Sequence, residues 1–252
     1  MKKLILSLLF LINSPVMAQM GDFMDDDIEL GSDIFSDFSE DITQKEMAED
    51  ERFYRYGRFF SFEIGFGGTF FDGNRGAAYK NDPPSIGLQL NYFMGFNLSL
   101  GLGFAFSKHH FFIDGPTVGF PANAPGLINV NALRTYWSYR YYIDTSNLGT
   151  AITYATPYFT GRLEYWYLTE KFEDQSALED VSGGGLGFGI GGGFEFPIEI
   201  KTTYIGVEFL FHGVNFHDKF TQKYRATTGS ITAFDDLTGN GYSTIVYYVL
   251  NW

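Results

Sequence analysis

The chain is 252 residues long, has a formal net charge of -13 and contains no cysteine. This length fits one domain of barrel size, and the absence of thiols excludes disulfides, cysteine nucleophiles and cysteine-ligated metals. The strong negative charge makes nucleic acid an unfavourable partner, so no nucleic-acid binding is expected. Aromatic residues make up 19% of the chain, which is typical of a barrel with one face in lipid and the other facing a lumen.

Residues 1–18 have the pattern of a secretory signal peptide. Lys2 and Lys3 precede an apolar run from Leu4 to Ile12, and residues of small or modest size follow up to Ala18. The run is too short to cross a bilayer as a helix. We therefore predict that residues 1–18 direct export.

Residues 19–57 are predicted to form an acidic periplasmic arm, either disordered or folded as a short helix. Acidic side chains crowd this segment, which is typical of a solvated tether. Ile34, Phe38 and Ile42 lie four residues apart and would share one face of a helix. That face would contact the barrel mouth, a second copy of the chain or a partner protein, so these three residues are candidate oligomer contacts.

The remaining residues, 58–252, predict a closed antiparallel transmembrane β-barrel of about eight strands, an all-β fold. Apolar residues alternate with small or polar ones, the period of a strand, in eight segments: 60–70, 86–92, 98–106, 133–141, 159–167, 186–196, 203–211 and 242–252. Short turns are expected near Met94 and at Pro197, and long loops over 72–84, 108–126, 171–182 and 214–240. Bacterial barrels place their short turns in the periplasm, so both termini are predicted to be periplasmic.

The competing fold is a soluble β-sandwich, which also has many alternating strands. The apolar residues of this chain are bulkier and more aromatic than a core shared by two sheets holds. The last strand alone presents Tyr242, Val246, Tyr248 and Trp252 on one face. This outer face is typical of a strand that closes a barrel in lipid.

From about Arg58 to Trp252 the chain resembles the OmpA/OmpX-type small outer-membrane barrels. The resemblance rests on the alternation, on the loop asymmetry and on the final Tyr248-Val249-Leu250-Asn251-Trp252, which is similar to an outer-membrane assembly signal. Such signals carry a glycine several residues before the end, where this chain has Tyr247. The resemblance implies a place in the outer membrane of a Gram-negative cell, with membrane lipid and the outer-membrane assembly machinery as partners.

Charged residues in the inward register predict a lumen network. An eight-stranded interior is nearly filled by side chains, and unpaired buried charge is costly, so these charges must pair. They form either a fixed plug of ion pairs or a gate with two pairings. The predicted network comprises Glu63, Arg134, Arg140, Arg162, Glu164, Glu195 and Glu208. The aromatics expected at the membrane interface are Trp137, Tyr139, Tyr141, Tyr248 and Trp252, whereas Trp166 falls in the inward register.

The four histidines, His109, His110, His212 and His217, map to the outer rim or the loops. With nearby Ser and Asp they raise the alternatives of a lipid hydrolase or acyltransferase and of a metal site. Neither chemistry is favoured, because it needs three convergent groups and the spacings match no motif. We therefore expect no enzyme activity, no metal and no cofactor.

The function indicated by the sequence is a structural or interaction role in the outer membrane. Exposed glycine and aromatic surface favours self-association, and the acidic arm would lock copies into a ring that confines lipid. The alternative is a narrow or gated porin-like channel, and a lipid-modifying enzyme is less favoured.

Overall fold

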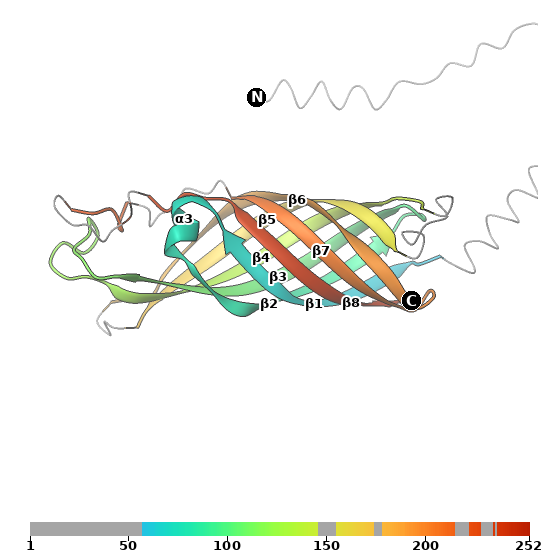
Figure 1. Cartoon of the computed structure of the whole chain (residues 1–252), viewed down its shortest axis with the longest axis horizontal. Coiled ribbons are helices and arrows are strands. Elements are labelled where there is room, and N and C mark those ends of the chain that lie inside the picture. The colour runs from blue at the N-terminus through green and yellow to red at the C-terminus, as the bar shows by residue number, and fades with distance from the viewer. Residues whose placement is uncertain (1–56, 146–154, 174–177, 215–221, 228–233, 235) are drawn as a thin grey trace, which may run out of the picture. The chain divides into compact units, whose positions relative to one another are not determined.

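The computed structural model describes residues 57–145, 155–173, 178–214, 222–227, 234 and 236–252. The predicted signal peptide, the arm up to residue 56 with Ile34, Phe38 and Ile42, and His217 lie outside these residues. Eight antiparallel strands form a closed barrel in which each strand pairs with the next and β1 pairs with β8 (Figure 1). The elements are β1 (Phe60–Phe71), α3 (Gly73–Ala78), β2 (Lys80–Phe93), β3 (Leu98–Ile113), β4 (Gly126–Tyr142), β5 (Thr156–Phe172), β6 (Val181–Glu199), β7 (Thr203–Val214) and β8 (Gly241–Asn251).

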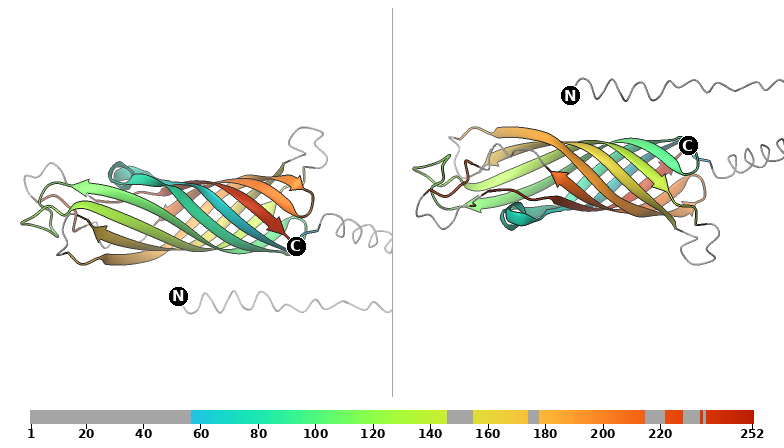
Figure 2. Two further views of the ribbon diagram at one scale, coloured as in Figure 1. Left: turned by 90° about the horizontal axis from the view of Figure 1, so that it is seen from below. Right: turned by 90° about the horizontal axis from the view of Figure 1, so that it is seen from above.

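The barrel wall has an apolar outer face. Along each strand, buried residues alternate with exposed ones, and the exposed set is aromatic and aliphatic, as in Phe66, Leu102, Trp137 and Leu163. A closed barrel pairs every strand edge, which is what a β-structure in hydrocarbon requires. The strands run obliquely across the wall in both views of Figure 2, as barrel closure demands. The closed barrel and its apolar exterior place the chain in the cell outer membrane and exclude the sandwich.

The start of β1 and the end of β8 lie at the same end of the barrel, which is the end with the short turns. The backbone amide of Phe60 donates to the carbonyl of Trp252 at 3.1 Å, and the two rings stack with centroids 6.2 Å apart. The opposite, long-loop end carries the short helix α3 (Figure 1). Within the described ranges, no helix has the length and hydropathy needed to cross a membrane.

Several strands extend further than the alternation predicted. The expected loop 108–126 shrinks because β3 continues to Ile113 and β4 begins at Gly126. The added residues continue the alternation, with Phe111, Ile113 and Ile128 buried on the inner face. The expected loop 72–84 contains α3 and the first residues of β2. The turn expected at Pro197 comes later, because β6 passes through Pro197 with a register shift that accommodates its missing amide hydrogen.

The interior beneath the long loops is an apolar core. Loop segments 114–125 and 222–227 are joined by backbone hydrogen bonds from Val118 to Arg225 and from Gly119 to Lys223, at 3.0 and 2.9 Å. Between them Tyr224 is fully buried, and its hydroxyl donates to Glu170. The core below consists of Ala78, Tyr79, Phe111, Ile113, Ile128, Val130, Ala132, Trp166, Leu168, Phe172, Val214 and Leu237.

Candidate functional site

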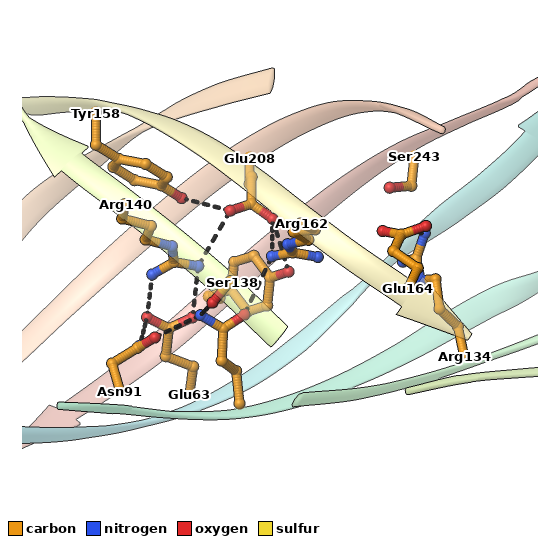
Figure 3. A network of polar contacts seen from close by, with 12 residues as sticks. Glu63, Asn91, Arg134, Ser138, Arg140, Tyr158, Arg162, Glu164, Glu208 and Ser243 are labelled. Atoms are coloured by element: carbon orange, nitrogen blue, oxygen red, sulfur yellow. Dashed lines mark hydrogen bonds and ion pairs between the residues drawn. The ribbon is translucent and has the colours of Figure 1, made fainter. Parts of the chain in front are cut away.

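The lumen toward the short-turn end is polar, and the structure places there all seven charged residues assigned to the lumen from the sequence. Each is at most 3% exposed. The residues labelled in Figure 3 lie in two groups, one around Arg140 and Glu208 and the other around Arg134 and Glu164. The residues come from five strands: Glu63 on β1, Arg134 and Arg140 on β4, Arg162 and Glu164 on β5, Glu195 on β6 and Glu208 on β7.

Arg140 organises the first group. Its two terminal nitrogens donate to the two carboxylate oxygens of Glu63, the second at 2.9 Å. The Nη2 atom also donates to Glu208 Oε2 at 3.0 Å. Arg162 donates to the other oxygen of Glu208, so that Glu208 bridges two arginines. Charge-assisted and bidentate pairs of this kind are the strongest hydrogen bonds in proteins.

Neutral side chains complete this group. Asn91 donates to Glu63 at 2.6 Å, and Gln89 accepts from Arg162 at 3.1 Å. The hydroxyls of Tyr158 and Tyr247 donate to Glu208 at 3.2 and 3.1 Å. These four residues were not predicted from the sequence, because a neutral residue in the inward register carries no signal of its own.

A glycine makes room for the stacking of this network. The ring of Tyr136 lies against Gly103, where a Cβ atom would come within 2.3 Å of the ring. Arg162 stacks on the same tyrosine, with its guanidinium carbon 4.0 Å from the ring centroid. A side chain at position 103 would therefore displace the ring on which Arg162 stacks.

The second group contains a serine, a histidine and a glutamate in a row. The His212 Nε2 atom lies 2.7 Å from the Ser243 hydroxyl oxygen, and its Nδ1 atom lies 3.0 Å from both carboxylate oxygens of Glu164. Trp166 donates to Glu164 at 2.9 Å, and Arg134 also contacts the imidazole. These distances are those of a nucleophile, base and carboxylate.

The surroundings of that row do not suit catalysis. Ser243 is 2% exposed and His212 is fully buried beneath the apolar core. A substrate would have to pass the packed layer that includes Trp166, whose ring contacts His212 with centroids 5.5 Å apart. We interpret the row as part of the lumen packing.

The other histidines lie elsewhere. His212 lies near the long-loop end of β7 and points inward, as the alternation predicts, because Phe211 and not His212 continues the outer face of this strand. His109 is also buried and pairs with the Ser107 hydroxyl at 3.0 Å, while His110 faces outward and pairs with Asp82 at 2.8 Å. The described residues include no group of three or more His, Asp or Glu arranged to hold a metal ion.

Arg58 lies at the short-turn end of the lumen, and its role there was not predicted from the sequence. Its Nη1 atom donates to Glu195 Oε2 at 2.6 Å, and only 9% of its side chain is exposed. The signal was weak, because Arg58 precedes the first strand and therefore has no alternation to assign it to a face.

The five aromatics assigned to the interface lie on the outer wall. Their exposed fractions lie between 46% for Tyr248 and 63% for Trp252. The others are Trp137, Tyr139 and Tyr141.

No protein-family model matches the chain, and no curated protein matches it in sequence. The fold is a closed eight-stranded antiparallel barrel, and small outer-membrane barrels of solved structure are similar to it. Neisserial surface protein A is 11% identical with a TM-score of 0.49, and the match covers 77% of this chain and 97% of that one. The N-terminal barrel of Pseudomonas aeruginosa OprF is 13% identical with a TM-score of 0.36, covering 76% and 97%. Ail, the attachment invasion locus protein of Yersinia pestis, is 11% identical with a TM-score of 0.42, covering 76% and 96%. These likenesses concern the fold alone.

Proposed function

We propose that the protein is a non-enzymatic outer-membrane barrel with a structural or interaction role. The observation that carries this proposal is the filled interior, with an ion-pair network toward one end and an apolar core beneath the long loops. A barrel filled in this way has no wide passage, and it can contact other molecules through its outer wall and its loops. In the orientation usual for bacterial barrels, the long loops face the outside and the arm is periplasmic.

We propose further that the barrels associate into a ring that confines lipid. On the outer wall of β5 and β6, Gly161 and Gly192 have no side chain, and beside them Phe159, Leu163 and Ile190 are 65%, 74% and 60% exposed. Small residues between projecting ones allow two walls to approach closely in a membrane. A head-to-tail contact of this kind generates a ring when its rotation closes.

Native mass spectrometry of the protein in mild detergent tests the ring. We expect a defined multimer that retains lipid in the full chain, and a shift toward monomer after deletion of residues 19–52. The substitution Gly161→Phe fills the gap on the outer wall and should also weaken the multimer. The matched control is Gly95→Phe, because position 95 lies in a turn where an added Cβ meets nothing within 4 Å. A bare monomer for the full chain would contradict the ring and leave a solitary barrel.

A narrow or gated channel is the alternative, and one observation favours it. Glu208 is shared between Arg140 and Arg162, so a shift of this carboxylate toward either arginine would give two pairings. Single-channel recording in planar bilayers distinguishes the two functions. A closed barrel gives no conductance, whereas a gate gives intermittent openings that change in the Glu208→Gln variant.

A further inference from the structure

Arg58 sits in a box of aromatic rings at the short-turn mouth of the barrel. Its guanidinium carbon lies 4.4 Å from the ring centroid of Phe93, 4.6 Å from that of Tyr204 and 5.1 Å from that of Tyr142. Glu195 pairs with the same guanidinium. Three rings and one carboxylate around a cation combine cation–π attraction with a charge-assisted hydrogen bond.

The walls of this box are held in place by contacts that do not involve Arg58. The Tyr142 hydroxyl donates to the second oxygen of Glu195 at 2.8 Å, which fixes the ring and the carboxylate together. The Tyr204 hydroxyl accepts from the backbone amide of Lys201 at 3.3 Å. Phe93 packs on Tyr142 with centroids 5.7 Å apart. The box is therefore preorganised by four strands, β2, β4, β6 and β7.

The neighbouring network has one positive charge too few to balance its carboxylates. On the strands, Glu63, Glu195 and Glu208 carry three negative charges against two positive charges on Arg140 and Arg162. Arg140 approaches Glu195 only to 3.7 Å, because it is engaged by the other two carboxylates. A buried carboxylate without a close counter-ion is strongly destabilising. The chain segment that enters from the arm supplies the missing charge.

We propose that Phe93, Tyr142, Tyr204 and Glu195 form a binding site for a guanidinium cation, and that Arg58 is its tethered ligand. A planar, weakly hydrated guanidinium suits stacked rings and a carboxylate better than an ammonium does. The site fastens the end of the acidic arm to the barrel mouth, so the arm starts from a fixed point on the lumen network. This role holds whether or not the barrels associate.

Chemical rescue of the full-length Arg58→Ala variant tests the site. Isothermal titration calorimetry in detergent should detect saturable binding of methylguanidinium by the variant and none by the wild type, whose site is filled. Methylammonium should bind at least about tenfold more weakly, because it lacks the planar fork. Binding of methylguanidinium should also raise the thermal unfolding temperature of the variant and leave that of the wild type unchanged.

A second variant separates the site from general damage. Arg58→Ala combined with Glu195→Gln removes both charges, so it keeps the network balanced and folds even if the single variant does not. It should bind methylguanidinium at least about tenfold more weakly than the single variant, or not at all. Arg225→Ala, on the loop at the opposite end, is the matched control and should show no binding. No binding by a folded Arg58→Ala protein, or equal binding by the double variant, would overturn the proposal.

The arm gives an independent readout. Chymotrypsin should cleave at Phe59 faster in Arg58→Ala than in the wild type, and methylguanidinium should not restore the slower rate, since the free cation has no link to the chain. Equal cleavage rates in the variant and the wild type would show that Arg58 does not fasten the arm.

Discussion

Arg140 on β4 binds Glu63 on β1 through both of its terminal nitrogens. The two strands are not neighbours in the wall, so this pair braces the barrel across its lumen. Both side chains are 1% exposed. The energetic consequence of such a pair depends on what remains when one partner is removed.

The first prediction concerns that brace. Arg140→Met leaves Glu63 as a buried carboxylate with no arginine partner and should lower the free energy of unfolding by about 3–5 kcal/mol. Urea unfolding of the refolded barrel, followed by the heat-dependent shift in electrophoretic mobility, measures this change.

The double variant Arg140→Met with Glu63→Gln is the informative control. In this variant the ion pairs of Glu195 with Arg58 and of Glu208 with Arg162 remain, so every remaining charge has a partner. The double variant should recover most of the lost stability, because deleting a whole buried pair is often nearly neutral. A double variant as unstable as the single one would show that the brace acts through packing and not through charge.

The second prediction concerns the row of Ser243, His212 and Glu164. Ser243→Ala should leave the lipid profile of the outer membrane unchanged and lower stability by about 1 kcal/mol, the usual value of one hydrogen bond. Mass spectrometry of extracted lipids makes the comparison, with His109→Ala, His110→Ala, His212→Ala and His217→Ala alongside. Labelling of Ser243 by a fluorophosphonate would contradict the structural interpretation and make the row an active site.

The strand alternation was sufficient to predict the barrel and the inward register of the lumen charges. Position 63 and position 140 each fall on the inner face because side chains alternate with period two. The pairing of these two residues was not predictable. It depends on the shear of the barrel, the stagger between its strands, which determines the positions that lie opposite one another across the lumen. The contact of Ser243 with His212 on the adjacent strand was not predictable for another reason: it depends on the register of β7 and β8, which places His212 opposite Gly241.

The long-loop end was harder to predict than the wall. Along β3, Lys108, His109 and His110 follow Ser107, and four polar residues in a row resemble a loop. The strand continues through them because His109 pairs with Ser107 inside the barrel and His110 with Asp82 outside it. Tertiary partners of this kind override the local pattern.

The third prediction concerns the closure of the long-loop end by Tyr224. Tyr224→Ala removes a fully buried ring from between Phe111 and Phe120. The loss of a buried aromatic costs about 3–5 kcal/mol, so segments 114–125 and 222–227 should separate before the barrel unfolds. Hydrogen exchange of the Val118 and Gly119 amides should then accelerate, while exchange in β8 stays at its wild-type rate.

Tyr224→Phe is the control for that substitution. It keeps the ring contacts and removes only the hydroxyl that donates to Glu170. Its exchange rates should lie close to those of the wild type. If both variants accelerate exchange equally, the hydrogen bond and not the ring holds the loops together.

The last prediction concerns acid and the contact between α3 and the final loop. Hydrogen bonds from Thr238 and from Asn74 lower the pKa of Asp236. Because the folded pKa lies below the unfolded value of about 3.9, the stabilisation is present above that value and is lost as the pH falls through the folded pKa. The Thr238 amide donates to Asp236 at 3.1 Å. Its hydrogen-exchange rate should therefore rise above the rate expected from the intrinsic effect of pH, and only in that acid range. Asp236→Asn should remove the acid transition, and a transition that persists unchanged in this variant would show that Asp236 is not its source.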